Sequence, residues 1–340
     1  MKRSVLNRVN LRRTMVAALA AMVSVTAFAG TGVAEPEKTP AVTSVVKEGR
    51  TWHLKVYSVA MGSEITVDVQ RPVDESKPAP NLYLLSGLDA GLSSASWKDQ
   101  TSVLQWLTDK QVNVIQPIGG KGSYYTDWIK PDPKLGVNKW KTFFTEELPP
   151  LLDKTLQSTG LNSLAGVSTS GTSVLQLAEA KPGLWKGVAA YSGCAQIADP
   201  VGRQYLKLAT ETWAGGNVDN MYGPADSPMW AANDPVINAE KLRGTELFIS
   251  SGSGLPVPAD LQWYQEDSPG FDGLTNLGVG SVIEAAVNAC THNLKNKLDS
   301  LNIPAAYDFY PIGTHRWSYW DDTFRGSWPM LAKSMGLPAK

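Results

Sequence analysis

An α/β domain built on a doubly wound, mostly parallel sheet, with helices on both faces, is the fold that the sequence predicts. Apolar stretches of strand length alternate with helix-like stretches along most of the chain, and such alternation is typical of βαβ units. The chain has 340 residues and contains no internal repeat or low-complexity tract. We therefore assign residues 51–340 to one large domain with a substantial core.

The strands and helices are expected in a regular order along this domain. Alternating apolar residues in 53–59 and 65–69 predict an antiparallel pair, turned at Met61-Gly62-Ser63. Further strands are expected at 82–85, 112–117, 164–167, 187–191, 247–250 and 305–310. The helices are expected at 102–110, 148–156 and 282–298, and directly after Ser168.

The first 34 residues have the three regions of a secretory signal peptide. They open with the basic residues Lys2, Arg3, Arg8, Arg12 and Arg13. An apolar, alanine-rich run over residues 15–29 follows, and it is shorter than the ~20 residues that span a bilayer. A membrane anchor is therefore the weaker alternative. We expect cleavage after Ala34, with Ala29 as the second choice, and export of the mature chain.

Charge and composition limit the classes of molecule that the exported part of the chain is expected to bind. The whole chain has a formal net charge of −1, and removing the basic signal segment makes the remainder more acidic. A mildly acidic chain without basic runs is a poor candidate for binding nucleic acid. No later segment approaches transmembrane length, so we expect a secreted protein, with peripheral contact to the cell envelope left open. Residues 35–50, with two prolines and mixed charges, are interpreted as a flexible leader.

The chain contains two cysteines, Cys194 and Cys290, and both lie in the exported part. An oxidising compartment permits a disulfide between them, which is the pairing that we expect. The alternative is two separately buried thiols. Two cysteines are too sparse a pattern for a metal site.

The segment Gly166-Val167-Ser168-Thr169-Ser170-Gly171 joins an apolar strand to an apolar helix. A serine between small residues in such a turn is typical of the nucleophile elbow of α/β-hydrolases. The turn would raise the Ser168 hydroxyl above the sheet and aim the Thr169 backbone N–H at a developing oxyanion. Ser170 stands where the usual motif Gly-x-Ser-x-Gly ends in glycine. An ordinary strand-to-helix turn capped by serine is the alternative interpretation.

A serine nucleophile needs a histidine base, and the chain has three histidines. In this fold the acid and then the histidine follow the serine, which excludes His53. His292 lies within the predicted helix 282–298, an awkward place from which to reach the serine. His315 lies in the loop after the last strand, so it is the expected base. Residue spacing alone does not decide which carboxylate is the acid that pairs with the histidine. The candidates are Asp260, Glu266, Asp267, Asp272 and Glu284.

Several motifs together resemble the antigen 85 mycolyltransferases and their corynebacterial relatives, over roughly residues 50–336. Besides the elbow they are residues 114–120 with 123–128, 139–149, 222–224 with 233–235, and 313–320. The resemblance implies an α/β-hydrolase catalytic domain over 51–340, with Ser168 as nucleophile, Glu284 as acid and His315 as base. It implies no organic cofactor and no metal.

The resemblance also implies the residues around the triad. The backbone N–H groups of Leu88 and Thr169 would form the oxyanion hole. Ser86 and Asp89 stand where the family has an aspartate and an arginine that help to hold trehalose, so the acceptor site is altered. Trp317 matches a tryptophan beside the catalytic histidine and would line the sugar site, unless it is a core aromatic. A bridge between the two cysteines would tie the acid-bearing helix to the sheet.

The activity implied by the resemblance is that of a secreted acyltransferase. Ser168 would take a mycolyl group from trehalose monomycolate and pass it to another trehalose monomycolate or to cell-wall arabinogalactan. Tryptophans such as Trp97, Trp213, Trp230 and Trp263 offer faces for sugar and lipid, although most are expected in the core. The alternatives are a carboxylesterase or thioesterase of the same fold, and a carbohydrate-binding relative without a working triad.

Overall fold

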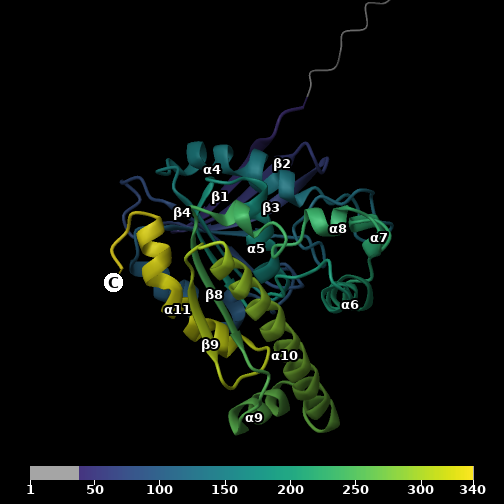
Figure 1. Cartoon of the computed structure of the whole chain (residues 1–340). Coiled ribbons are helices and arrows are strands. Elements are labelled where there is room, and N and C mark those ends of the chain that lie inside the picture. Colours follow the sequence, from purple (N-terminus) through teal and green to yellow (C-terminus); the bar gives the residue numbers. More distant parts are fainter. Residues whose placement is uncertain (1–37, 340) are drawn as a thin grey trace, which may run out of the picture. The chain divides into compact units, whose positions relative to one another are not determined.

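The computed structural model describes residues 38–339, which form one unit around a nine-stranded sheet (Figure 1). The expected signal peptide over residues 1–34 lies outside the described residues. The strands are β1 (Ala41–Glu48), β2 (Thr51–Ser58), β3 (Ser63–Gln70), β4 (Asn81–Leu85), β5 (Asn113–Ile118), β6 (Asn162–Val167), β7 (Trp185–Tyr191), β8 (Glu246–Gly252) and β9 (Ala306–Tyr310). Their order across the sheet is β1-β2-β3-β5-β4-β6-β7-β8-β9.

The sheet is antiparallel at its N-terminal side and parallel beyond it. β1, β2 and β3 pair antiparallel, and β3 pairs antiparallel with β5. From β5 to β9 all neighbouring strands are parallel. The mostly parallel sheet is therefore confirmed, and β2 with β3 is the antiparallel pair expected from the alternating residues. Because the parallel strands share one carboxyl edge, the loops that follow them gather there, where such folds place their sites.

The helices connect the strands and fold back on the sheet. They are α1 (Trp97–Gln100), α2 (Val103–Trp106), α3 (Trp140–Thr142), α4 (Leu148–Leu156), α5 (Thr169–Ala180), α6 (Pro200–Lys207), α7 (Val218–Met221), α8 (Met229–Ala232), α9 (Pro258–Asp267), α10 (Phe271–Ser300) and α11 (Trp317–Ser334). Short turns of 3₁₀ or π geometry lie at Leu107–Asp109, Phe143–Glu147, Leu208–Trp213 and Ala239–Leu242. The helix expected at 148–156 is confirmed as α4, and the one at 102–110 is α2 with the 3₁₀ turn after it.

Helices cover both faces of the sheet, as the sequence predicts. Tyr83 and Leu85 of β4 pack in one core with α4, α5 and α10. Leu82 and Leu84 point to the other face and pack with α1, α2 and α11. Successive side chains of a strand point to opposite faces, so a strand covered on both faces is a continuous apolar run. This is why the short apolar stretches identified the central strands.

The interpretation of residues 35–50 as a flexible leader is wrong for residues 41–48. These residues form β1, which pairs with β2 from Ala41 to Glu48 with one bulge. Most of the β1 side chains are exposed. The strand is therefore held by backbone hydrogen bonds at the edge of the sheet, and it has no apolar run that a sequence pattern could detect.

The helix expected at 282–298 begins earlier than predicted, because α10 starts at Phe271. Gly273 and Gly280 suggest a loop, yet both are buried inside the helix. A Cβ atom at Gly273 would lie 2.3 Å from the Ser268 carbonyl oxygen, and one at Gly280 would lie 2.1 Å from the Tyr264 hydroxyl. These glycines therefore allow α10 to approach α9 closely. Neither α10 nor any other helix of the described residues is long and apolar enough to cross a membrane.

Candidate active site

Ser168 occupies a strained turn between β6 and α5. Its backbone has φ 57° and ψ −126°, a conformation that is rare for residues other than glycine. The Ser168 N–H donates to the Tyr191 carbonyl at 2.9 Å, and the Ser168 carbonyl accepts from the Gly171 N–H at 2.9 Å. A Cβ atom at Gly171 would lie 2.7 Å from the Tyr191 carbonyl oxygen. The glycine after Ser170 thus lets the turn sit directly against β7.

Ser170, which replaces the final glycine of the usual elbow motif, has a structural partner. Its buried hydroxyl donates a hydrogen bond to the carbonyl oxygen of Ser86, in the loop after β4. The same loop carries Leu88. The departure from the motif therefore ties the elbow to the loop beside it.

We expect the Ser170→Ala variant to lose about 1–3 kcal/mol of stability, because the buried Ser86 carbonyl would lose its donor. The rate constant kcat for ester turnover should also fall, since the loop that holds Leu88 would be less fixed. Urea unfolding and steady-state kinetics measure the two effects. Ser173→Ala is the matched control, because the Ser173 hydroxyl is equally buried in α5 but donates to the Tyr124 and Thr169 carbonyls and not to the loop that carries Leu88. Equal losses of kcat in both variants would contradict a specific role for Ser170.

His315 lies between Ser168 and Glu284, with one ring nitrogen facing each. Its Nε2 is 2.9 Å from the Ser168 hydroxyl oxygen, and its Nδ1 is 2.7 Å from Glu284 Oε2. His315 comes from the loop between β9 and α11, and Glu284 comes from α10. The Glu284 side chain is fully buried, and 10% of the His315 side chain is exposed. Three distant segments thus form one hydrogen-bonded chain that ends at the serine.

The buried Glu284 carboxylate is held by hydrogen bonds from neutral groups. Its Oε1 accepts from the Ser192 hydroxyl and from the Gly252 backbone N–H, each at 2.7 Å. The indole N–H of Trp320 in turn donates to the Ser192 hydroxyl at 2.9 Å. Such donors stabilise an ionised carboxylate in a buried place. The carboxylate therefore keeps Oε2 directed at His315.

The loop after β4 approaches the serine closely. A Cβ atom at Gly87 would lie 3.2 Å from the Ser168 Cβ, so glycine permits this approach. Among the hydrogen bonds of residues 38–339, none uses the backbone N–H of Leu88 or of Thr169. Two free N–H groups beside a serine hydroxyl can stabilise a negatively charged oxygen.

A pocket of about 360 Å³ opens over Ser168. Its lining residues are Gly87, Leu88, Asp89, Ala95, Lys121, Ser168, Trp213, Trp317 and Trp320. The sequence-predicted Asp89 and Trp317 therefore lie at the pocket, whereas Ser86 is buried and is not part of the lining. Trp317 also packs on Trp97 and Trp320 in the core, with ring centroids 5.5 and 5.0 Å away.

Asp89 is an anchored anion at the rim of the pocket. Its carboxylate is 2.8 Å from the Lys121 ammonium and accepts a hydrogen bond of 2.5 Å from the Ser93 hydroxyl. Partial burial raises the pKa of Asp89, but the hydrogen bonds from Lys121 and Ser93 outweigh it and hold the pKa below its usual value. The carboxylate thus offers acceptor oxygens to a ligand at neutral pH.

The structure places the other candidates away from the serine. His53 bonds Asp68 on β3 at 2.7 Å, and His292 is exposed on α10. Asp260 forms an ion pair of 2.6 Å with Arg316. Of the tryptophans named from the sequence, Trp213 lines the pocket, whereas Trp97 and Trp230 are buried in cores and Trp263 packs on Tyr264 of α9. The described residues contain no group of three or more side chains suited to a metal ion.

Sequence reasoning missed three residues of this arrangement, namely Ser192, Trp320 and Lys121. Ser192 directly follows β7 and has a positive φ of 48°, which a sequence pattern does not reveal. Trp320 is the last residue of the motif 313–320, which carried the resemblance without indicating a role for this tryptophan. Lys121 is an ordinary loop residue by pattern. The roles of these residues depend on neighbours that are distant in sequence, so the local pattern does not reveal them.

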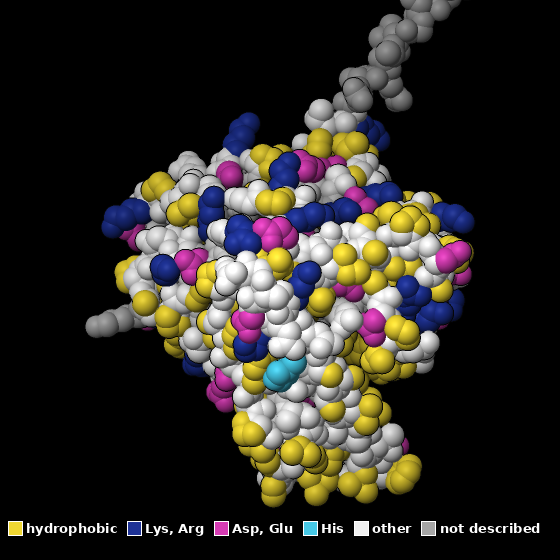
Figure 2. Space-filling view, viewed as in Figure 1, with side chains coloured by type: hydrophobic (Ala, Val, Ile, Leu, Met, Phe, Trp, Pro, Cys, Tyr) yellow, Lys and Arg dark blue, Asp and Glu magenta, His cyan; other side chains and the backbone are white. Residues whose placement is uncertain are grey.

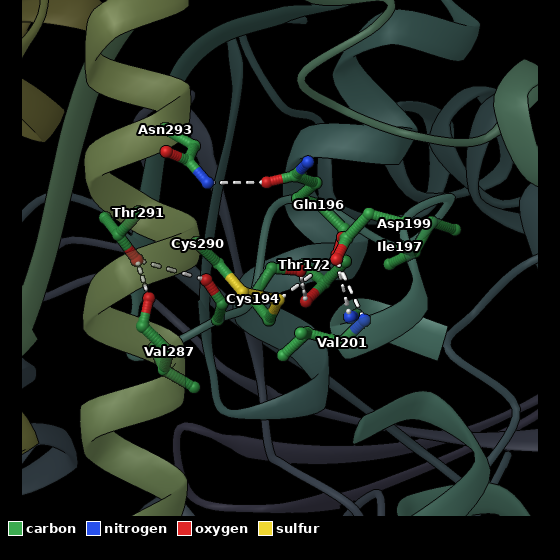
Figure 3. Close-up of a disulfide and its surroundings, with 12 residues drawn as sticks. Thr172, Cys194, Gln196, Ile197, Asp199, Val201, Val287, Cys290, Thr291 and Asn293 are labelled. Atoms are coloured by element: carbon green, nitrogen blue, oxygen red, sulfur yellow. Dashed lines mark hydrogen bonds between the residues drawn. A yellow bond between two sulfur atoms is a disulfide. The ribbon is translucent and has the colours of Figure 1, made fainter. Parts of the chain in front are cut away.

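The disulfide expected between Cys194 and Cys290 is present (Figure 3). Cys194 lies in the loop after β7, and Cys290 lies on α10, the helix that carries Glu284. The Asn293 amide donates to Gln196 Oε1 at 2.7 Å, and the Thr172 hydroxyl donates to the Cys194 carbonyl at 2.9 Å. The bridge and these bonds fix α10 against the loop beside α5.

We expect the Cys194→Ser/Cys290→Ser double variant to be less stable by about 4.7 kcal/mol, the chain-entropy value for so long a loop. The bridge spans 96 residues. Thermal unfolding of the variant and of the reduced parent should show the same lowered Tm. The reducing agent should leave the Tm of the variant unchanged. A variant as stable as the oxidised parent would contradict this expectation.

Residues 58–331 match the model of a protein family described as "Putative esterase". The diacylglycerol acyltransferase/mycolyltransferase Ag85A of Mycobacterium ulcerans is 32% identical over 292 residues, covering 84% of this chain and 81% of that protein. Ag85B of Mycobacterium avium, of the same description, is 31% identical over 291 residues, covering 84% and 83%. These are relatives over nearly the whole described domain.

Solved structures share the fold. MPT51 of Mycobacterium tuberculosis has a TM-score of 0.67 at 21% identity, covering 82% of this chain and 97% of that one. FphF, a serine hydrolase of Staphylococcus aureus, has a TM-score of 0.58 at 17% identity, covering 84% and 96%. The arrangement of sheet and helices is thus shared with MPT51 and FphF.

Proposed function

Since this chain belongs to the esterase family that its residues 58–331 match, and within it to the antigen 85 mycolyltransferases, we propose that Ser168 carries an acyl group between two alcohols. The chain is an enzyme of the acyltransferase and esterase class. The observation that carries the proposal is the hydrogen-bonded series from Ser168 through His315 to Glu284.

In the first half of the proposed reaction, the Ser168 oxygen attacks the carbonyl carbon of an ester. His315 Nε2 accepts the serine proton, and Glu284 stabilises the resulting imidazolium. The N–H groups of Leu88 and Thr169 bind the oxygen that becomes negative. The tetrahedral intermediate then breaks its bond to the donor alcohol, which leaves with the proton from His315.

In the second half, a new alcohol replaces the first one in the pocket. Its hydroxyl gives its proton to His315 and attacks the acyl-enzyme, and Ser168 leaves with that proton. The acyl group is then an ester of the acceptor, with no oxidation or reduction. Transfer exceeds hydrolysis only when the acceptor is bound and water is kept from the acyl-enzyme.

We propose trehalose monomycolate as the donor, and a second trehalose monomycolate or cell-wall arabinogalactan as the acceptor. The relatives are named mycolyltransferases, and the pocket offers groups that suit a sugar. Asp89 and Lys121 can hydrogen-bond hydroxyl groups, and Trp213 and Trp317 present aromatic rings. Asp89 is a fixed anion, so it would accept hydrogen bonds from a sugar where an arginine would donate them.

A product assay with purified protein tests the proposal. The protein is incubated with labelled trehalose monomycolate, and products are separated with trehalose, arabinan, diacylglycerol or no added acceptor. We expect trehalose dimycolate or mycolylated arabinan to exceed free mycolate. Diacylglycerol is included because the relatives are described as diacylglycerol acyltransferases as well as mycolyltransferases. Free mycolate as the main product under every condition would make the protein an esterase instead.

Labelling with a fluorophosphonate separates the enzyme from a carbohydrate-binding relative. We expect one adduct, located on Ser168 by peptide mass spectrometry, because an activated serine attacks the phosphorus atom. A protein that binds trehalose but forms no adduct would contradict the enzymatic proposal.

We also propose that the mature protein is secreted and works at the cell envelope. Basic, apolar and small residues follow one another over residues 1–34, in the order of a signal peptide. N-terminal sequencing of protein from culture medium and envelope fractions should give a start after Ala34 or after Ala29. An uncleaved chain in the cytoplasm would contradict this assignment.

A further inference from the structure

A helical arm, residues 255–283, extends beyond the sheet and consists of α9 and the first part of α10 (Figure 1). Before Glu284, the only buried residues of α10 are Gly273 and Gly280. The two helices of the arm therefore contact through glycines at close range. This part of α10 buries no large apolar side chain.

Several large apolar side chains of the arm face outward, whereas Tyr264 is buried and Ile283 packs against the disulfide cysteines. Phe271 is 82% exposed and Val282 is 71% exposed. Leu274 comes three residues after Phe271, and Val282 comes eight residues after Leu274. This spacing places the three side chains on one face of a helix. Other exposed apolar residues on or beside the arm are Leu255, Leu261, Val279 and Ile312. An apolar helix face normally packs against a core, whereas this one is open to solvent.

The arm contains no basic residue. The chain has no lysine or arginine between Arg243 and Lys295. The charged residues of the arm are acidic, namely Asp260, Glu266, Asp267 and Asp272. Figure 2 shows hydrophobic side chains over the part of the molecule where Figure 1 places α9 and the start of α10. An anionic surface would repel such an arm, and an uncharged apolar layer would accept it.

The arm is joined to the loop that carries His315. The Gly280 carbonyl of α10 accepts a hydrogen bond from the His315 N–H at 3.3 Å, and the Leu255 carbonyl accepts one from the Gly313 N–H at 2.7 Å. Asp260 of α9 forms its buried ion pair with Arg316. A surface that receives the arm would therefore lie beside the opening over Ser168.

We propose that the arm inserts Phe271 and Val282 into an uncharged lipid layer, so that Ser168 acts where a lipid-linked donor is held. The nature of that donor rests on the proposed function. Burial of the exposed apolar face drives the insertion, and the exposed acidic side chains of Glu266, Asp267 and Asp272 stay in water. The lipid chains then reach the pocket without crossing bulk water, which an acyl donor of low solubility requires.

Vesicle flotation tests the proposal directly. Protein carrying Ser168→Ala, which prevents turnover, is mixed with vesicles of phosphatidylcholine alone or with added phosphatidylglycerol. We expect binding to the uncharged vesicles and weaker binding when the anionic lipid is present. A further Phe271→Ser substitution should lower the partition coefficient of the protein between vesicles and water roughly tenfold. Phe271→Ser together with Val282→Ser should lower it roughly a hundredfold. Val73→Ser is the matched control, because Val73 is an exposed apolar residue in the loop before β4.

An introduced thiol gives a second measurement. Both native cysteines are in the disulfide, so Phe271→Cys provides a single site for an environment-sensitive fluorophore. We expect its emission to shift to the blue with phosphatidylcholine vesicles, and the emission of a label at Val73→Cys to stay unchanged. Hydrolysis of a short soluble ester by Phe271→Ser in the parent background should equal that of the parent.

Three results would overturn the proposal. The first is no binding of the parent to uncharged vesicles, and the second is binding that Phe271→Ser and Val282→Ser leave unchanged. The third is a dimer, seen by light scattering, that Phe271→Ser dissociates while vesicles are not bound. Failure of the proposed function can be recognised separately. It would appear as absent acyl transfer by the parent, whereas vesicle binding is measured with the inactive Ser168→Ala variant.

Discussion

Replacing Ser168 by alanine is expected to lower kcat for acyl transfer about 10⁶-fold, the size of loss seen when a serine nucleophile is removed. The Ser168 oxygen is the atom that would form the acyl bond, and no neighbouring hydroxyl is hydrogen-bonded to His315 Nε2 in its place. The substitution keeps Cβ and the strained turn. Binding of substrate and stability should therefore remain close to those of the parent.

The measurements are single-turnover transfer with a labelled donor, fluorophosphonate labelling and thermal unfolding. Ser44→Ala is the control, because Ser44 is exposed on the edge strand β1, far along the sheet order from β6. We expect the control to retain full transfer and labelling. Transfer by Ser168→Ala within tenfold of the parent would show that another residue carries the acyl group.

The second large effect is expected from Glu284→Gln, which should lower kcat about 10⁴-fold, as the loss of the carboxylate does in other triads. The glutamine oxygen can still accept from Ser192 and Gly252. Its amide nitrogen would then face His315 Nδ1 and donate to it. This places the histidine proton on Nε2, so His315 can no longer accept the proton of Ser168.

This variant separates the effect on chemistry from an effect on folding. Glutamine has the shape of glutamate and removes a buried charge, so we expect the Tm to be unchanged or higher. The rate of fluorophosphonate labelling at Ser168 should fall together with kcat. Glu266→Gln on α9 is the control, because Glu266 is exposed. If the glutamine variant transferred acyl groups nearly as fast as the parent, Glu284 would not be the acid.

Features encoded by local residue patterns could be predicted from the sequence. Leu148–Leu156 has helix periodicity, and it is α4 with those bounds. The apolar strands of the parallel sheet were found because burial on both faces leaves an uninterrupted apolar run. The turn at Ser168 was predicted from small residues between such a strand and a helix. In each case the signal lies within a few adjacent residues.

Other features could not be predicted because their cause lies elsewhere in the chain. β1 is held by its backbone pairing with β2 and has no apolar face to mark it. The start of α10 was missed because Gly273 and Gly280 usually mark loops. Their function here is close contact with Tyr264 and Ser268, which depends on how two helices pack.

The sequence by itself determined the strands β2 to β9, the helices α4 and α5, the serine turn and the histidine loop, because periodicity and turn chemistry are local properties. Residue spacing left five carboxylates open as the acid, and the family resemblance named Glu284. Only the tertiary structure placed Glu284 against His315 and added Ser192 and Trp320 around it. Glu284 is 31 residues from His315 and 92 from Ser192. Contacts at such separations are set by strand order and helix packing, and these arise only when the whole sheet has formed.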